Sequence, residues 1–240
     1  MCIFSSEAVV EKTIVMAAET LSGTHLMGYQ NQVTSKKKNV MLLPLPCVGK
    51  FTFHDTTPYK NFLTQIGMEI LLDEAKGKRG GESIDFSRVG QYEVAQVPSS
   101  DVAQILKDLR QPIQWWLPNM IESYEFSSWL FCIMDANTSM SQQPILVEYD
   151  PGDPETMFLP MMDIHGDDKY EQQIMRNHIL IIGKPNLPDS LIKSSDIENF
   201  PFPGLEFGGG SKQGMGKNGD GIIYKKQDGT NGVRYHTNFN

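Results

Sequence analysis

Hydrophobic residues in the first half of the chain come in short runs separated by polar turns, which is the pattern of β-strands. Residues 13–17 and 25–30 are two such runs, and the turn-prone sequence LSGT at 21–24 lies between them. Residues 50–54 alternate between polar and apolar with a period of two. Because the side chains of a strand point alternately to its two faces, these patterns predict a sheet at the centre of this half.

Two helices interrupt the predicted strands. A Thr-Pro pair at 57–58 can cap and start a helix, and apolar residues with helical spacing continue it to 76–77. A shorter amphipathic helix is predicted at 102–109, after a Ser-Ser-Asp cap. Pro44 and Pro46 limit the apolar run before the first helix to an edge or kinked strand, because proline donates no ladder hydrogen bond.

The second half repeats the order of the first. Strand candidates at 124–134 and 144–149, with a polar turn between them, resemble those at 25–33 and 39–46. Two hairpins of one design would form two similar β-layers, although chance similarity between short strands explains the pattern equally well. Further strands are predicted at 157–160 and 177–183. The predicted fold class is therefore α+β, with a sheet-dominated body and two or three helices.

The composition changes at residue 201. Residues 201–219 are rich in glycine and follow neither a helical nor a strand period, which predicts a flexible segment. Beyond them, 222–226 and 233–237 flank the turn-rich sequence QDGTNG and predict a hairpin. An isolated hairpin is marginally stable in water, so the body of this chain or another chain must cover it. We divide the chain into a globular domain at 1–200 and a Gly-rich tail with a terminal hairpin at 201–240.

Composition and charge narrow the range of functions. Of the 240 residues, 40% are hydrophobic and 21% are charged, as in ordinary globular proteins. A formal net charge of −8 argues against a general nucleic-acid binder, which needs a surplus of Lys and Arg. No segment approaches the length of a membrane span, and the first residues lack the pattern of a secretory signal. We expect a cytoplasmic protein, or a component of a particle such as a virion that assembles inside a cell.

Cys2, Cys47 and Cys132 are an odd, widely spaced set that predicts neither a disulfide framework nor a CxxC metal site. If Met1 is removed, Cys2 presents a thiol and a free α-amine together. In N-terminal-nucleophile hydrolases that amine acts as the general base, so a cysteine hydrolase of amide bonds is one hypothesis. The competing interpretation, which we favour, makes Cys2 a small buried residue of an N-terminal strand.

The acidic stretch around residue 165 is a candidate metal site. Asp163, His165 and Asp167 place oxygen and nitrogen ligands at alternate positions, and such ligands can hold a divalent metal ion. The spacing does not match a calcium-binding EF-hand, because the twelfth residue from Asp163 is Ile174 rather than Glu. A solvated acidic loop is the simpler interpretation, and no other cofactor is predicted.

Two histidines stand near strand ends. His54 precedes an aspartate, His178 lies in an apolar run, and either could act as a base for a distant thiol such as Cys47 or Cys132. Histidines at strand edges are more often structural, and the chain has no GxSxG nucleophile elbow. The glycines at 208–216 lack the strand and helix context of a phosphate-binding loop, which favours a flexible linker.

Several short segments together resemble a family of uncharacterised proteins of unknown function. The matching segments are the opening MCIFS, the Asn-x-Met-x-Leu-Pro-Leu-Pro sequence at 39–46, the Tyr-Glu-x-x-x-Val-Pro-Ser sequence at 92–99, Ile-His-Gly at 164–166 and Asn-His at 177–178. The resemblance covers about residues 1–183, leaves the Gly-rich tail outside, and implies no activity. It implies an arginine where this chain has Ala18, which argues against charge-assisted chemistry at Cys2.

These observations favour a non-enzymatic role. The leading hypothesis is a structural or interaction protein, a subunit of a larger assembly whose tail at 201–240 docks on a neighbouring chain. A tail of this composition needs a contact that offsets its conformational entropy. The expected partner is another protein or a second copy of this chain, and neither a membrane nor nucleic acid is expected. The alternative hypothesis is the cysteine hydrolase acting through Cys2.

Overall fold

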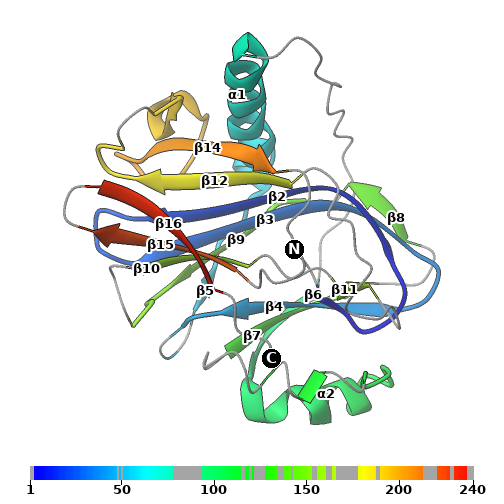
Figure 1. Ribbon diagram of the computed structural model, residues 1–240. Helices are drawn as coiled ribbons and strands as arrows, with labels where there is room; N and C mark the ends of the chain where they lie inside the picture. Colours follow the sequence, from blue (N-terminus) through cyan, green and yellow to red (C-terminus); the bar gives the residue numbers. More distant parts are fainter. Residues whose placement is uncertain are drawn as a thin grey trace.

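In the part of the chain that the structure describes, the apolar runs form strands in three sheets, and α-helices pack against them (Figure 1). The computed structural model describes residues 3–47, 49, 51–77, 93–114, 117–118, 121, 128–134, 138–141, 143–152, 156–160, 164–165, 178–187, 190–212, 221–227 and 230–236. Within these residues the architecture is α+β and sheet-dominated, which confirms the predicted fold class.

The largest sheet has the strand order β13-β14-β12-β2-β3-β9-β5, and β8 pairs with β3 beside that path. We call it the large sheet. At its centre β2 pairs antiparallel with β3 and parallel with β12. Its strands are β2 (Val9–Glu19), β3 (His25–Ser35), β5 (Thr52–Phe53), β8 (Thr138–Ser141), β9 (Ile145–Tyr149), β12 (His178–Lys184), β13 (Ile192–Lys193) and β14 (Glu206–Lys212).

Two smaller sheets complete the β-structure. The five-stranded sheet has the order β11-β1-β4-β7-β6 and contains β1 (Ile3–Phe4), β4 (Asn39–Leu45), β6 (Glu93–Pro98), β7 (Ser128–Met134) and β11 (Ile164–His165). The three-stranded sheet has the order β10-β15-β16 and contains β10 (Thr156–Pro160), β15 (Gly221–Gln227) and β16 (Thr230–His236). Strand β10 also lies against β2 and β4, so the three-stranded sheet borders both others.

The helices form where the sequence predicts them. The 3-10 turn η1 (Thr57–Tyr59) and α1 (Phe62–Gly77) occupy the first predicted helix, and η2 (Ser99–Asp101) and α2 (Val102–Asp108) occupy the second. A further 3-10 turn, η3, spans Ser194–Asp196. Figure 1 shows α1 against the large sheet and α2 on the opposite side of the molecule, beyond the five-stranded sheet. The large sheet and the five-stranded sheet therefore lie between α1 and α2.

The central strands of the large sheet are buried on both faces. Along β2, Ile14, Met16 and Ala18 pack in the apolar cluster that contains α1. The alternate residues Val15 and Ala17 pack in the core shared with the five-stranded sheet. A strand covered on both faces needs apolar residues at nearly every position, which explains the continuous run at 13–17.

The Gly-rich sequence EFGGGSK forms β14, which pairs with β12 along its whole length. A Cβ atom at Gly209 would lie 1.9 Å from the carbonyl oxygen of Leu180 and 3.0 Å from Cδ1 of Ile70 in α1. Only glycine fits this position, because a real Cβ does not approach backbone so closely. The predicted flexible linker is therefore wrong for residues 206–212, whereas 213–220 lie outside the described residues.

The predicted terminal hairpin is confirmed. β15 pairs antiparallel with β16, and Gln227 faces Thr230 across the turn. β15 also pairs with β10 of the same chain, so the body of the protein supplies the contact that the hairpin requires. The division of the chain at residue 201 stays a prediction.

The predicted pairing of 25–33 with 39–46 is wrong, because β3 belongs to the large sheet and β4 to the five-stranded sheet. β3 pairs with β9, and β4 pairs with β7, so each half of the suggested repeat gives one strand to each sheet. Of the two predictions for the proline-containing strand, an edge or a kinked strand, the edge does not hold for β4 as a whole, which lies between β1 and β7. Pro44 is tolerated there because β1 pairs only with Met41 and Leu42.

Candidate functional site

A histidine, a carboxylate and a hydroxyl meet at the β5 end of the large sheet. His54 follows β5, and its Nε2 lies 3.0 Å from Oε2 of Glu148 in β9. The Thr24 hydroxyl, from the turn between β2 and β3, donates to the other carboxylate oxygen of Glu148 at 2.6 Å. The side chains of His54 and Glu148 are 23% and 25% exposed. The pair is thus shielded but reachable from solvent.

The order of these groups does not suit nucleophilic catalysis. In a catalytic triad the imidazole lies between the carboxylate and the nucleophile, whereas here Glu148 lies between His54 and Thr24. The sequence places His54 beside Asp55, but Asp55 accepts a hydrogen bond from the backbone N–H of Thr57 at 2.9 Å. Hydrogen bonds from Thr57 also lower the pKa of Asp55. The pair is therefore a polar tie between two strands.

Cys47 does not supply the missing nucleophile. Its side chain is buried, and its Sγ lies 3.6 Å from the carbonyl oxygen of Gly49. Burial, and after it the negative charge of Asp150, raises the pKa of the Cys47 thiol to about 11. The reactive form of cysteine is the thiolate, so Cys47 is unreactive at neutral pH. For Cys132 the structure describes the backbone, which pairs with Met41 and Val94.

The N-terminal strand is held by a buried polar network that no sequence motif predicted. The Ser5 hydroxyl lies 2.9 Å from Oδ1 of Asn39 and 2.8 Å from Oε1 of Gln111. Oδ1 of Asn39 accepts from the backbone N–H of Ser6 at 3.0 Å, and its Nδ2 donates to the Ser6 carbonyl at 2.9 Å. We call Ser5, Ser6, Asn39 and Gln111 the N-terminal clamp. It fixes the chain directly after β1, whose Ile3 and Phe4 are fully buried.

The residues predicted for chemistry lie mainly outside this description. Cys2, Asp163 and Asp167 are outside the described residues, and for His165 and His178 only the backbone is described, in β11 and β12. No group of three or more metal-ligating side chains occurs in the described part of the chain. The thiol chemistry of Cys2 and the metal site around His165 therefore stay predictions.

None of the helices in the described ranges is long and apolar enough to cross a membrane. No protein-family model matches the sequence, and no curated protein matches it either.

Solved structures provide the informative comparison. The crystal structure of baculovirus P35 is 15% identical to this chain and superimposes with a TM-score of 0.55, covering 98% of this chain and 95% of P35. The chain has the fold of baculovirus P35. Two further P35 structures match with a TM-score of 0.44: the caspase-8/P35 complex at 14% identity, covering 94% of this chain and 91% of P35, and a mutated P35 after caspase cleavage at 16% identity, covering 95% of each.

The P35-like fold is shown by the first of these matches alone. Its coverage of both chains means that the sheets and helices described above, and not a single shared motif, carry the similarity. A shared fold does not by itself assign an activity.

Proposed function

We propose that this protein functions by binding another protein, and that its partner is a caspase. The observation that supports the proposal most is the fold shared with baculovirus P35 over nearly the full length of both chains. P35 forms a complex with caspase-8, and a mutated P35 is known after caspase cleavage. A binding role also agrees with the polar His54–Glu148 tie and the unreactive Cys47, which provide no catalytic site in the described residues.

The proposal extends to Asp85 as the residue that the caspase recognises. Caspases are proteases specific for aspartate, and proteases bind their substrates as extended strands. The connection from α1 to β6 comprises the 15 residues 78–92. Asp85 is its only aspartate. Most connections in compact domains are shorter, with about 4–6 residues.

A competition assay tests the proposal. Active caspase-8 is mixed with increasing amounts of the protein, and hydrolysis of a fluorogenic aspartyl peptide is followed. We expect competition with the peptide, together with fragments corresponding to residues 1–85 and 86–240 in the mass spectrum. Asp85→Ala should weaken the competition by at least about a hundredfold, because a site that binds a carboxylate rejects an analogue without it.

Asp73→Ala is the matched control, since Asp73 is an exposed aspartate within α1. It should compete like the natural protein. Cleavage after Asp167 or Asp168, in the connection from β11 to β12, would keep the caspase as partner but reject Asp85. Absence of competition at a tenfold molar excess would reject the caspase itself.

Docking of the tail on a neighbouring chain is a second, subordinate proposal. It is supported by β16, which in the described residues pairs on one side only, with β15. An edge of this kind can accept a further strand. The pairing of β15 with β10 reduces the need for such a neighbour. Light scattering of the full chain and of a chain ending at residue 220 should then show a larger assembly only for the full chain.

A further inference from the structure

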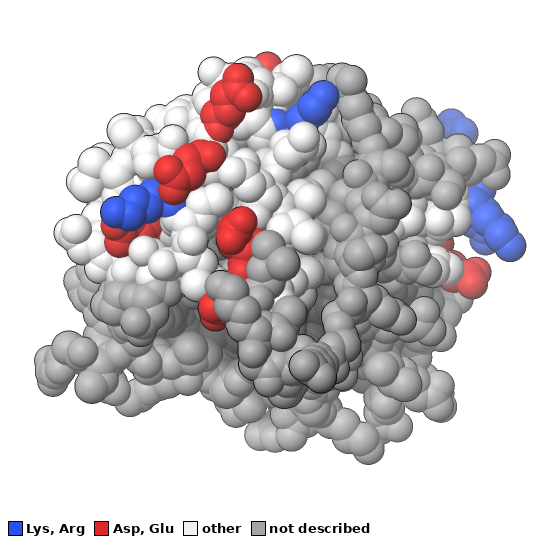
Figure 2. All heavy atoms as spheres, turned by 90° about the horizontal axis from the view of Figure 1, so that it is seen from above, with Lys and Arg blue, Asp and Glu red and all other residues white. Residues whose placement is uncertain are grey.

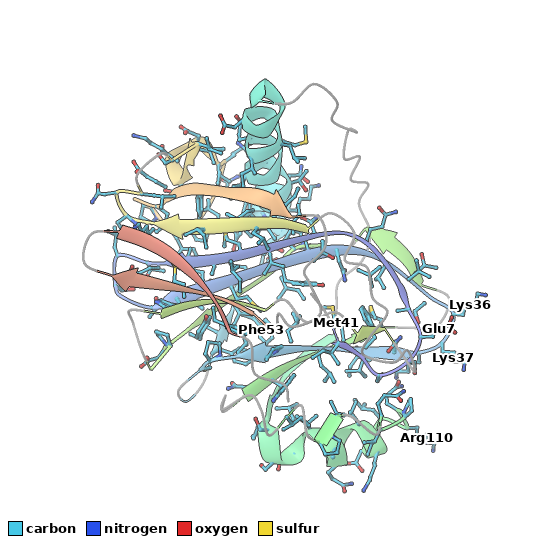
Figure 3. All side chains as sticks on the ribbon, in the orientation of Figure 1. Glu7, Lys36, Lys37, Met41, Phe53 and Arg110 are labelled. Carbon is cyan, nitrogen blue, oxygen red and sulfur yellow. The ribbon has the colours of Figure 1, made fainter. Side chains whose placement is uncertain are left out.

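Three consecutive lysines form an exposed basic cluster where the chain passes from the large sheet to the five-stranded sheet. Lys36, Lys37 and Lys38 connect β3 to β4, and all three are exposed. The ion pairs that the structure gives between described residues, such as His54–Glu148 and Lys193–Glu206, do not include any of the three lysines. Figure 3 shows Lys36 and Lys37 projecting from the end of the molecule.

Arg110 belongs to the same end of the molecule. Lys38 precedes Asn39, and Arg110 precedes Gln111, and the amide oxygens of Asn39 and Gln111 both lie within 2.9 Å of the Ser5 hydroxyl. The N-terminal clamp therefore brings Arg110 close to the lysines (Figure 3). We call Lys36, Lys37, Lys38 and Arg110 the basic end.

The backbone of Arg110 has a conformation that is unfavourable for a residue with a Cβ atom. Arg110 follows the C-cap residue of α2 and has φ of 56°, in the left-handed region. Glycine is the usual residue at this position, because a Cβ is unfavourable there. The other non-glycine residues with positive φ in the described part of the chain are both asparagines, which tolerate it. An exposed arginine in this conformation lowers the stability of the fold compared with glycine. This cost suggests a role for its guanidinium group.

The charge of the basic end is opposite to that of the whole chain, which is −8. Figure 3 shows Glu7 beside Lys36 and Lys37, and Asp108, two residues before Arg110, already accepts a hydrogen bond from Gln104 at 2.8 Å. Figure 2 shows Lys and Arg side chains at the right-hand end of the described surface, with an acidic side chain beside them, and further Lys and Arg among the Asp and Glu on the rest of that face. A local excess of positive charge attracts an anionic partner before contact.

We propose that the basic end is a docking surface for an acidic segment of a protein partner. Unpaired lysines and an arginine attract carboxylates by charge, and arginine binds them with two parallel hydrogen bonds. Nucleic acid is the less suitable occupant, because neutralising its regularly spaced phosphates needs a longer basic track than these four residues form. The proposal is independent of whether the partner in the preceding section is a caspase.

Fluorescence anisotropy with labelled deca-glutamate as the probe tests this surface. At 50 mM salt the natural protein should bind the peptide, and at 200 mM salt binding should weaken because surface charges are screened. The triple variant Lys36→Glu, Lys37→Glu and Lys38→Glu should bind at least about tenfold more weakly, since each exposed charge contact contributes about 0.5 kcal/mol. Arg110→Gly should bind about twofold more weakly while its Tm stays equal or rises.

The control is a triple variant with the same net charge, Lys60→Glu, Lys76→Glu and Lys193→Glu, which changes α1, β13 and the residue after η1 instead. It should keep at least half of the affinity. Equal losses in both triple variants would show that only net charge matters and would overturn the proposal. Tighter binding of a ten-nucleotide single-stranded DNA than of deca-glutamate, or no binding of the peptide at 50 mM salt, would also overturn it.

Discussion

Two buried regions hold the central strands of this protein by different means. Beneath α1 the contacts are apolar, and the helix sits close to the sheet because Gly209 has no side chain. Around the N-terminal strand the contacts are polar, and Asn39 connects Ser5, Ser6 and β4 through hydrogen bonds. The apolar region beneath α1 is destabilised when an atom is added. The polar region around the N-terminal strand is destabilised when a hydrogen-bonding group is removed, because its partners are left buried and unsatisfied.

The largest effect is expected for Gly209→Ala in the apolar region. The added Cβ would meet the backbone oxygen of Leu180 at 1.9 Å, and backbone in the middle of a sheet cannot move aside. We expect a loss of about 4 kcal/mol or more of unfolding free energy, as for severe overpacking, measured by urea denaturation.

Gly67→Ala is the matched control, because Gly67 lies in α1, on the other side of the same interface. Its added Cβ would meet only side-chain atoms, Cδ1 of Ile179 at 3.3 Å and Cδ1 of Ile14 at 3.4 Å. Alanine is better than glycine in a helix by about 1 kcal/mol, so this variant should be close to neutral. Similar stabilities of the two variants would refute the close approach of Gly209 to the backbone of Leu180 in β12.

The next largest effect is expected for Asn39→Ala in the N-terminal clamp. Asn39 is fully buried, and its loss leaves the backbone groups of Ser6 without their partner at 3.0 and 2.9 Å. The expected loss is about 2–3 kcal/mol of unfolding free energy. Gln114→Ala removes one longer bond, of 3.4 Å to the Ser5 carbonyl, and should cost about 1 kcal/mol or less. If both variants cost the same, the network does not centre on Asn39.

The smallest effect concerns Cys47 and appears only at alkaline pH. Its pKa is about 11 in the folded protein, above the ordinary value of 9.0, so folding favours the neutral thiol. That stabilisation is complete below pH 9 and is lost as the pH rises from 9 through 11. Cys47→Ala removes this pH-dependent stabilisation. Burial also raises the pKa of Tyr59 to about 12, but Tyr59 is present in both proteins and affects them equally.

The measurement for Cys47 is urea denaturation of both proteins at pH 8, 9, 10 and 11. The stability of the natural protein should fall more steeply above pH 9 than that of Cys47→Ala. Parallel curves would mean that the thiol has its ordinary pKa and is not buried as described.

Local sequence patterns predicted the individual helices and strands better than they predicted which strands pair with one another. The Thr-Pro start and the helical spacing of Phe62, Leu63, Ile66 and Ile70 predicted α1, because amphipathicity is a property of one segment. The hairpin β15–β16 followed in the same way from its turn residues. Strand β14 was missed, since glycines lack the side chains that signal a strand, and its conformation depends on α1 packing above it.

The candidate site was less predictable because its residues are distant in the sequence. Glu148 lies 94 residues from His54, and nothing near His54 indicates this partner. The N-terminal clamp joins Ser5 to Gln111 over 106 residues. Both depend on sheet pairing, which a pattern of apolar residues leaves undetermined when strands are buried on both faces.

The most direct test of the central claim is native mass spectrometry of this protein mixed with active caspase-8 in equal amounts. We expect a new species whose mass is the sum of this 27.0 kDa chain, intact or cleaved, and the caspase. Two separate, unchanged species at micromolar concentrations of both proteins would contradict the claim that this chain with the P35 fold binds a caspase.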